Sequence, residues 1–378
     1  MSVSTILLSA GEASGDMYAA QLAMALRKRT SAKFFGMGGP RMATAGVELV
    51  VDYHEVAVVG ISEVLRKVAS VVRVQTRLAR EASRRGAALA ILVDSPGTHL
   101  GVARRLKKSG IPVGYFIGPQ IWAWRAGRVR VVKRLVKRIV VIFPFEEKIY
   151  RDAGVPVDFV GHPLVGMVKP TLSRLEFAKR HGLDAARRIV ALLPGSRPNE
   201  IAQNYPPLLK ACDLLDRAFE GTGGVQFVHA AAPGLKADLF RRNPSPRLAI
   251  ERIEGATYDA LAAADCAIVA SGTATVEAAL LGTPMVVIYR VAPTTALILR
   301  RMIRTPFIAM VNLIAGRRVV PELIQDQFTP AALEVEVRRL LQSRAAREEM
   351  QAGLAEVRTK LGPEGAIERA ADVFARML

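Results

Sequence analysis

The segment from Ala270 to Glu277 holds residue types that could bind the phosphates and sugar of a nucleotide. It follows an apolar run, Cys266–Ala270, and opens a helical pattern that ends at Gly282. Gly272 permits a tight turn and close approach of a ligand, and the first N–H groups of the helix can donate to phosphate oxygens. We therefore predict a nucleotide site in which Glu277 holds sugar hydroxyls, and its residues are Ser271, Gly272, Thr273, Ala274 and Glu277. The alternative is an ordinary helix start with a threonine cap.

A cation stands in a similar turn, Leu192–Arg197, between an apolar run and a helix that begins near Asn199. The planar guanidinium of Arg197 can pair with two oxygens of a diphosphate. As a nucleotide leaves, this charge would stabilise the negative charge that develops. We predict a catalytic role for Arg197, against the alternative of a surface arginine.

Two turns in the first half carry carboxylates. Asp94 follows the apolar run Ala88–Val93, a position that suits a general base, although it could instead cap the next helix. His99, five residues later, is the runner-up base, but a core or solvent-facing histidine is the plainer interpretation. The turn Ala10–Asp16 offers Glu12 as a sugar ligand or base, and Ser14 or Asp16 as a helix cap.

Three further segments combine aromatic, basic or glycine residues. The turn Gly118–Arg125 contains both tryptophans, and Trp124 could line an acceptor pocket or belong to the core. The segment Arg125–Arg138 that follows reads as a basic amphipathic helix, suited to anionic surfaces or simply solvated. Gly36–Arg41 is expected to be a flexible connecting loop.

A second basic amphipathic pattern spans Val58–Arg85. Helical spacing of apolar residues usually means core packing, but the apolar stripe is broad and flanked by many arginines. Insertion into a lipid interface is the competing hypothesis, with a predicted membrane-contact set of Val59, Val64, Leu65, Val68, Val72 and Arg73.

These turns all follow apolar runs that alternate with helical segments along the 378 residues. The predicted strands are Thr5–Ser9, Ala88–Val93, Pro112–Ile117, Arg138–Phe143, Val157–Val160, Arg188–Leu193, Val225–His229, Leu248–Arg252, Cys266–Ala270 and Met285–Tyr289. Such alternation predicts parallel sheets covered by helices, an α/β fold with two Rossmann-like domains facing a cleft, as in GT-B glycosyltransferases. We expect two such domains, over 1–168 and 169–345, that meet near 161–170, followed by C-terminal helices over 346–378. In such sheets, ligands bind beyond the carboxyl ends of strands.

The chain carries a net charge of +19, of which residues 1–168 hold +13 (25 Lys and Arg, 12 Asp and Glu) and residues 169–378 hold +6 (28 and 22). This field would attract anionic lipid, phosphorylated substrates or nucleic acid, but known nucleic-acid modules are absent. No uncharged apolar run is long enough to span a bilayer, and the amino terminus lacks a signal-peptide pattern. Cys212 and Cys266 lie in apolar surroundings, which indicates reduced core residues of a cytosolic protein.

The motifs together resemble those of the lipid-A-disaccharide synthase family. The resemblance runs from about residue 4 to the end of the chain, and the segments that carry it are Ala10–Asp16, Gly60–Leu65, Trp122–Arg125, Gly161–Pro163, Leu193–Arg197, Ala270–Glu277, Asn312–Arg317 and Pro321–Leu323. It implies an inverting GT-B enzyme that joins UDP-2,3-diacylglucosamine to 2,3-diacylglucosamine 1-phosphate (lipid X), giving a β-1,6-linked disaccharide 1-phosphate and UDP. It also implies work at the cytoplasmic face of the inner membrane, without a metal or other cofactor.

The family likeness adds roles to the candidate residues. It implies that Asp94 deprotonates the acceptor 6-hydroxyl, that Arg197 and the helix at Thr273 hold the diphosphate, and that Glu277 binds the ribose. Asn312 matches a donor-site position. The resemblance further implies that 1–168 is the acceptor- and membrane-facing domain and that 169–345 is the UDP-sugar donor domain. In this family the C-terminal helices, here 346–378, pack back on the first domain and can exchange between protomers, which allows a homodimer.

The chain departs from the family in two places. Gly118 stands where the family often has serine. Where the family commonly has Asp-Ala-Pro-Asp-Phe-Asn, residues 94–99 read Asp-Ser-Pro-Gly-Thr-His, so the first carboxylate remains and the second is lost. Two other interpretations stay open: another GT-B enzyme that uses a UDP-amino sugar, and a non-catalytic protein that binds anionic lipid.

Overall fold

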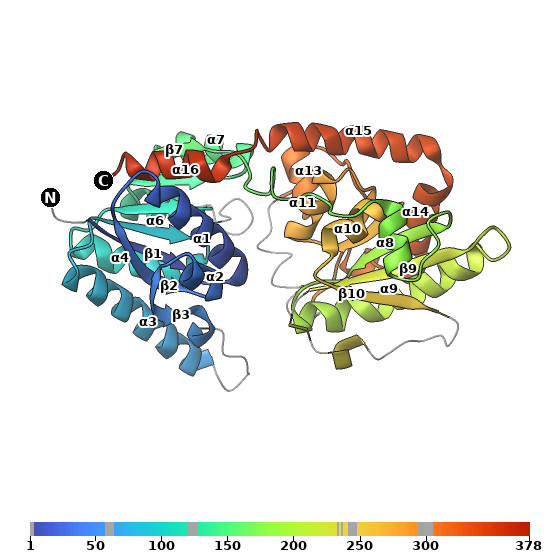
Figure 1. Cartoon of the computed structure of the whole chain (residues 1–378), viewed down its shortest axis with the longest axis horizontal. Helices are drawn as coiled ribbons and strands as arrows, with labels where there is room; N and C mark the ends of the chain where they lie inside the picture. Colours follow the sequence, from blue (N-terminus) through green and yellow to red (C-terminus); the bar gives the residue numbers. More distant parts are fainter. Residues whose placement is uncertain are drawn as a thin grey trace. The chain divides into compact units, whose positions relative to one another are not determined.

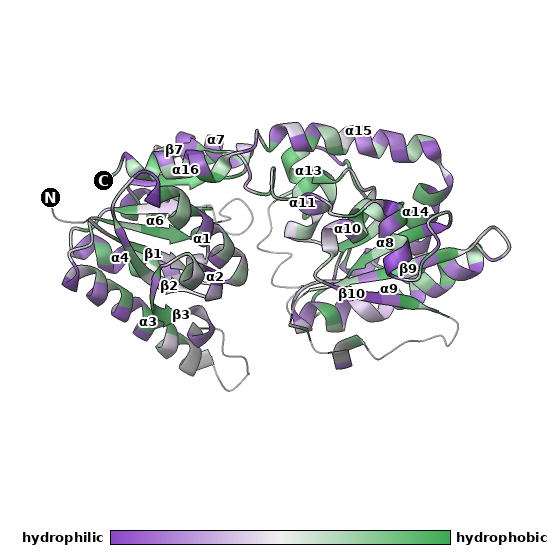
Figure 2. Cartoon of the chain, viewed as in Figure 1, coloured by the Kyte–Doolittle hydropathy of each residue, from purple (hydrophilic) through white to green (hydrophobic). Residues whose placement is uncertain are grey.

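The computed structural model describes residues 4–56, 64–119, 128–232, 234–235, 237–240, 248–292, 296 and 305–378. The chain forms two units, each with a parallel β-sheet between helices (Figure 1). The first unit comprises Met1–Val165 and Leu361–Leu378, and the second comprises Gly166–Lys360. The strands of both sheets are predominantly hydrophobic (Figure 2), as expected for parallel strands that helices cover on both faces.

The first unit holds a seven-stranded parallel sheet with the order β3-β2-β1-β4-β5-β6-β7. Its strands are short apolar runs whose side chains alternate between the two faces. Tyr115 of β5, for example, packs in the core beneath α3, α4 and α6, whereas the next residue, Phe116, contacts Phe374 of α16 edge-on. The strands are β1 (Thr5–Ala10), β2 (Lys33–Gly38), β3 (Glu48–Asp52), β4 (Leu89–Val93), β5 (Val113–Phe116), β6 (Arg138–Val141) and β7 (Val157–Phe159).

The helices of the first unit include one from the far end of the chain. Helix α16 packs on α1, and Arg29 beyond α1 pairs with Glu368 and Asp372 at 2.6 Å each. The predicted packing of a C-terminal helix on the first domain is therefore confirmed for α16. The helices are α1 (Ala13–Arg27), α2 (Pro40–Thr44), α3 (Val64–Arg84), α4 (Pro96–Lys108), α6 (Arg128–Leu135), α7 (Pro144–Asp152) and α16 (Ala366–Ala375), with a 3-10 turn η1 (Tyr53–Val56).

The second unit holds a six-stranded parallel sheet with the order β10-β9-β8-β11-β12-β13. The strands are β8 (Arg188–Leu193), β9 (Val225–Ala231), β10 (Ile250–Glu254), β11 (Cys266–Ala270), β12 (Met285–Tyr289) and β13 (Glu322–Ile324). The α-helices and 3-10 turns around them are α8 (Arg174–Arg180), α9 (Pro198–Ala218), η3 (Ala237–Phe240), α10 (Thr257–Ala263), α11 (Thr273–Leu280), α13 (Met310–Ala315), η4 (Gln325–Gln327), α14 (Pro330–Gln342) and α15 (Arg344–Lys360).

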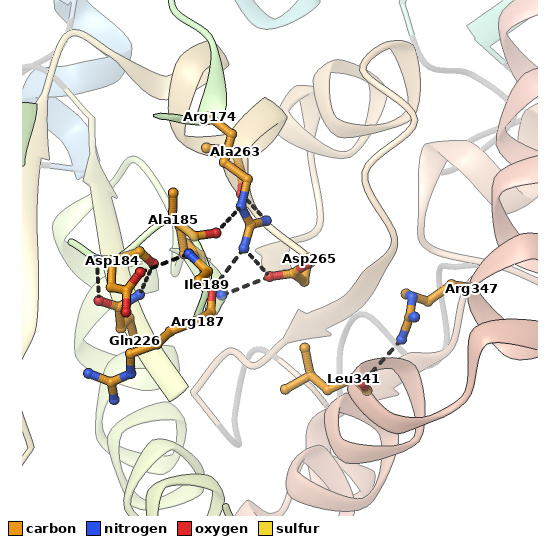
Figure 3. Close-up of polar contacts among 11 residues, drawn as sticks. Arg174, Asp184, Ala185, Arg187, Ile189, Gln226, Ala263, Asp265, Leu341 and Arg347 are labelled. Atoms are coloured by element: carbon orange, nitrogen blue, oxygen red, sulfur yellow. Dashed lines mark hydrogen bonds and ion pairs between the residues drawn. The ribbon is translucent and has the colours of Figure 1, made fainter. Parts of the chain in front are cut away.

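Polar contacts close the amino-terminal edge of this second sheet (Figure 3). The guanidinium of Arg174, on α8, donates to the carbonyl oxygens of Ala185, Ala263 and Arg187 and pairs with Asp265 at 2.9 Å. Asp265 also accepts from the N–H of Ile189 at the start of β8. The polar groups at this end of the strands therefore form hydrogen bonds and ion pairs with one another. The candidate site residues of the second unit lie at the opposite, carboxyl-terminal end of the strands.

Both sheets have a switch point, where the strand order reverses direction. It lies between β1 and β4 in the first unit and between β8 and β11 in the second. Ligands of open α/β sheets bind beyond the carboxyl ends of strands at such points. The turns after these four strands contain the predicted site residues Glu12, Ser14, Asp94, Arg197 and the 271–277 segment.

The structure corrects one predicted loop and adds strands. Gly36 and Gly38 belong to β2 and not to a flexible loop, and Phe35 of the same strand is buried. The glycine is needed because a Cβ at position 36 would lie 1.8 Å from the carbonyl oxygen of Leu8 in β1. Strands β2, β3 and β13 were not among the predicted runs.

Candidate active site

Asp94 occupies a left-handed turn between β4 and α4. The φ angles of Asp94 and Ser95 are 51° and 48°, a conformation that costs L-residues about 1–2 kcal/mol each. The N-cap position of α4 is Ser95, so the alternative in which Asp94 caps this helix is wrong. The carboxylate of Asp94 therefore stands just before the helix, at the switch point.

The turn after β1 lies beside the Asp94 turn. Ala10 pairs with Val93 in the β1–β4 register, and a Cβ placed on Gly11 would lie 2.6 Å from Ser95 Oγ. Glu12 and Ser14 are exposed at the start of α1. This arrangement gathers two hydroxyl- or carboxylate-bearing side chains and Asp94 along one edge of the sheet.

Asp16 has a structural task that sequence reasoning did not assign. Its buried carboxylate accepts from the N–H groups of Gly39, Arg41 and Met42 at 2.7–3.1 Å. A carboxylate is favoured there because the first N–H groups of α2 carry the positive end of its dipole. Asp16 thus fixes the start of α2 and does not cap its own helix.

His99 is fully buried, with 0% exposure, and both ring nitrogens have polar contacts. Burial lowers the pKa of its imidazole to about 4, so the ring is neutral near pH 7. The interpretation of His99 as a core histidine is therefore confirmed over a solvent-facing one.

Arg197 stands in the turn after β8, immediately before α9. Its guanidinium is mostly exposed and pairs with Glu200 at 3.2 Å, and Glu200 also accepts from the N–H of Ser196. Glu200 thereby holds the turn and orients Arg197 through an exposed ion pair, and exposed ion pairs of this kind contribute little energy. Asn204 fixes the same turn from inside by donating to the Pro194 carbonyl at 2.9 Å.

Gly272 gives the turn after β11 a conformation that side chains do not tolerate. Its φ and ψ are 156° and −163°, a region that is almost restricted to glycine. A Cβ built on Gly272 would meet no atom within 4 Å, so open space lies above the turn. The Thr275 hydroxyl donates to the Gly272 carbonyl at 2.7 Å, which leaves the start of α11 well ordered.

Neighbouring strands bring this turn beside that of Arg197. Val269 of β11 pairs with Leu193 of β8, so the two turns leave adjacent strand ends. Further along α11, the Tyr258 hydroxyl lies 3.4 Å from Glu277 Oε1, and burial raises the pKa of the Glu277 carboxyl. The second unit thus combines a guanidinium, a helix N-terminus and a carboxylate at one edge.

Asn312 is buried, and its amide is fully used within the protein. It donates to Glu322 Oε1 at 2.7 Å and to the Val320 carbonyl, and it accepts from two backbone N–H groups. Glu322 in turn accepts from the N–H of Ile308, whose carbonyl binds the Ser271 hydroxyl at 3.1 Å. Asn312 therefore connects to the nucleotide turn through Glu322 and the 308 backbone.

Helix α3 divides its side chains between the core and the surface. Val74 and Leu78 lie in the core, whereas Val68 and Val72 are 56% and 43% exposed beside the exposed Arg73.

Trp124 and Val59 fall outside the described residues, as do the side chains of Val64 and Leu65. No helix of the described chain is long and apolar enough to cross a bilayer.

Polar residues that organise these turns and were not predicted include Tyr115, Asn204, Glu200 and Glu322. Tyr115 and Asn204 sit inside apolar or helical patterns and carry no local signal in one sequence. Glu322 follows Pro321 in a segment that does resemble the family, which was its only signal.

Two parallel α/β units with a switch point in each form the architecture of the GT-B fold. The fold is similar to the S. aureus MnaA–UDP co-structure (TM-score 0.68, 12% identity, covering 100% of this chain and 98% of that chain). It is also similar to MurG of Acinetobacter baumannii (TM-score 0.59, 14% identity, 99% and 100%).

The chain belongs to the lipid-A-disaccharide synthase family: the model of lipid-A-disaccharide synthetase (LpxB) matches residues 6–375. The lipid-A-disaccharide synthase of Solibacter usitatus is 49% identical over 97% of this chain and 95% of its own length. That of Acidobacterium capsulatum is 46% identical over 100% and 97%. The predicted fold class, family and enzyme class are thereby confirmed.

Proposed function

We propose that this glycosyltransferase joins UDP-2,3-diacylglucosamine to lipid X, with Asp94 as the base and Arg197 at the leaving group. The observation that carries the proposal is the placement of chemically different groups at the two switch points. The first unit offers a carboxylate in a strained turn, and the second offers a cation and a helix N-terminus. A deprotonated acceptor and a stabilised pyrophosphate are the two needs of this reaction.

Asp94 activates the acceptor. Its carboxylate takes the proton of the 6-hydroxyl as that oxygen attacks the anomeric carbon of the donor. The new bond forms on the face opposite the bond to UDP, which inverts the configuration and gives a β-linkage. Glu12 and Ser14, exposed in the adjoining turn, bind sugar hydroxyls of the acceptor.

The second unit binds the donor and stabilises the leaving group. As the bond between the anomeric carbon and the diphosphate breaks, negative charge grows on UDP. Arg197 exchanges Glu200 for a phosphate oxygen, and the N–H groups at the start of α11 donate to the diphosphate. Glu277 accepts from ribose hydroxyls, while Asn312 keeps Ser271 in place through Glu322.

The direct test uses purified full-length protein with detergent-dispersed lipid X and UDP-2,3-diacylglucosamine. We expect release of UDP and a tetraacyl disaccharide 1-phosphate, measured by a coupled UDP assay and mass spectrometry. UDP-N-acetylglucosamine, which lacks the acyl chains, should be turned over far more slowly. Turnover of that sugar in preference to the acylated donor would contradict the proposal in favour of another UDP-amino-sugar enzyme.

We further propose that α3 rests on an anionic membrane surface. Val68 and Val72 are exposed on α3, and Arg73, Arg77 and Arg80 of the same helix are exposed as well. Apolar residues beside cations bind the boundary of a bilayer that contains anionic lipid. Such binding would place the first unit near acylated substrates and fits a peripheral protein of the inner membrane.

Vesicle flotation tests this second proposal. Vesicles of phosphatidylethanolamine with phosphatidylglycerol should float the wild-type protein in low salt and release part of it in high salt. Val68→Glu with Val72→Glu should weaken binding by about 10-fold, because two apolar contacts are lost and two negative charges are added. Val335→Glu, a 51% exposed valine of α14, is the matched control and should bind like the wild type. Equal binding by all variants would contradict the proposal.

A further inference from the structure

Three hydrogen bonds hold the backbone N–H and carbonyl groups of Asp94. Its N–H donates to the Phe116 carbonyl at 3.0 Å. Its carbonyl oxygen accepts from the Tyr115 hydroxyl at 2.6 Å and contacts His99 Nδ1 at 2.7 Å. Both lone pairs of this oxygen are therefore engaged, one by β5 and one by α4.

These contacts determine the tautomer of His99. A carbonyl oxygen can only accept, so Nδ1 carries the proton and donates it to Asp94. The other ring nitrogen, Nε2, is then an acceptor, and the Ser9 hydroxyl donates to it at 2.9 Å. A hydrogen-bonded chain thus runs from Ser9 on β1 through His99 to the backbone of Asp94.

The backbone that receives these bonds is strained. Two consecutive non-glycine residues with positive φ persist only where the surroundings over-determine them. Without the two donors, the carbonyl of Asp94 is free to rotate toward an ordinary conformation, and the carboxylate moves with it. Helix α4 begins at Pro96, whose ring disfavours a right-handed helical conformation at Ser95, so the helix does not extend back into the turn.

We infer that His99 and Tyr115 are positioning residues that hold Asp94 in the strained turn from which its carboxylate reaches the acceptor hydroxyl. The inference rests on the proposed role of Asp94 as base. His99 acts as a neutral hydrogen-bond donor and takes no proton from the substrate. Its Nδ1 sits at the same distance along the side chain as the amide nitrogen of an asparagine, so an asparagine at position 99 keeps a donor in this place.

Kinetics of four variants test the inference: His99→Leu, which removes the donor; His99→Asn, which retains one; Tyr115→Phe; and Asp94→Asn. We expect kcat of His99→Leu to fall by about 10- to 100-fold, because a misplacement on the order of 1 Å can cost 100-fold. Tyr115→Phe should lose about 3- to 10-fold, since one donor remains. His99→Asn should stay within about 3-fold of the wild type, and KM for both substrates should change little in all three.

A matched control separates positioning from stability. Val102→Ala removes a fully buried side chain from the same helix α4 without touching Asp94, so it should lower the melting temperature yet preserve kcat. An unchanged kcat in His99→Leu would overturn the inference. So would a His99→Asn variant as slow as His99→Leu, because size and burial would then matter and the donor would not.

The outcomes also separate this inference from the proposed function. A wild-type protein that releases no UDP from the acylated pair contradicts the proposed reaction itself. An active wild type whose Asp94→Asn variant keeps its full rate contradicts the base assignment and the positioning roles together. An active wild type with a slow Asp94→Asn and a fast His99→Leu overturns the positioning roles alone.

Discussion

The turn after β4 and the turn after β11 stand at equivalent switch points, yet they are built in opposite ways. The first turn uses residues with side chains, Asp94 and Ser95, in a conformation that they resist. Side-chain donors from elsewhere in the unit hold it there. The second turn uses Gly272, with open space where a Cβ would be.

The difference follows from what each turn presents. A base must be delivered as a side chain at a defined place, which needs a rigid backbone beneath it. A phosphate cradle presents backbone N–H groups, which needs the absence of a side chain above it. We therefore expect a substitution of Asp94 to lower kcat and a substitution of Gly272 to raise KM for the donor.

The largest expected effect comes from the side chain of the first turn. Asp94→Asn keeps the shape of the residue and removes the base, so kcat should fall by about 1,000-fold with KM nearly unchanged. Steady-state UDP release measures this. Asp158→Asn, which removes a carboxylate of β7 paired with Arg138, is the control and should keep its rate. A small loss of kcat in Asp94→Asn would contradict the role of Asp94 as the catalytic base.

Arg197→Ala should have the next largest effect, on the second unit. Removing a charge-assisted donor from a leaving group costs about 100-fold in kcat. Arg217→Ala is matched, because Arg217 stands near the end of α9, the helix that Arg197 precedes, in an exposed ion pair with Asp213. If both arginine variants behave alike, the guanidinium of Arg197 has no special place in the reaction.

Gly272→Ala tests the empty space of the second turn. The added methyl group costs about 1–3 kcal/mol of backbone strain, and it occupies the space above the turn. We expect KM for the donor to rise by about 10-fold. Gly282→Ala, at the other end of α11 with φ of 70° and nothing within 4 Å, should lose stability without a change in KM. Equal KM values for the two variants would argue against a cradle at Gly272.

The last prediction sharpens the comparison through the pH dependence of stability, which is measured apart from the reaction. The pKa of His99 is about 4 in the folded chain, against an ordinary value of 6.5. Between these values the unfolded chain binds the proton and the folded chain does not, so stability is lost as pH falls from 6.5 toward 4. From pH 7 to pH 4.5 this amounts to about 2 kcal/mol for one histidine.

The measurement compares wild type with His99→Asn, which has no titrating group at this position. Their difference in unfolding free energy, from urea titrations at both pH values, should shift by this amount in favour of the variant on acidification. Hydrogen-exchange mass spectrometry should assign the shift to peptides of the first unit. A constant difference across this range would show that His99 titrates as it does in the unfolded chain.

Some elements of the fold could be predicted from the sequence to the residue. Strands β8, β11 and β12 are continuous apolar runs bounded by polar residues or proline, and the structure has them as predicted. Strand β2 was missed because Gly36 and Gly38 resemble a loop, and only its contact with β1 explains them. The contact that matters joins residues far apart in the chain, which a local pattern does not record.

The candidate site shows the same division. Arg197 and Thr273 could be placed at strand ends because each turn has a local signature. The support of Asp94 could not, since Ser9 and His99 are 90 residues apart and Tyr115 lies inside an apolar run. Asn312 was predicted as a donor-site residue from the family likeness, but its buried contacts with Glu322 required coordinates.

The place of α16 bears on how the protein is made. This helix is synthesised after the whole second unit, yet it covers α1 and packs the fully buried Phe374 against Phe116 of the first unit. On the ribosome, the first unit must wait for the whole of residues 166–360 before its own sheet is covered. A nascent chain stopped before Leu361 leaves an apolar face of that sheet without its partner, and such a chain is a natural substrate for chaperones.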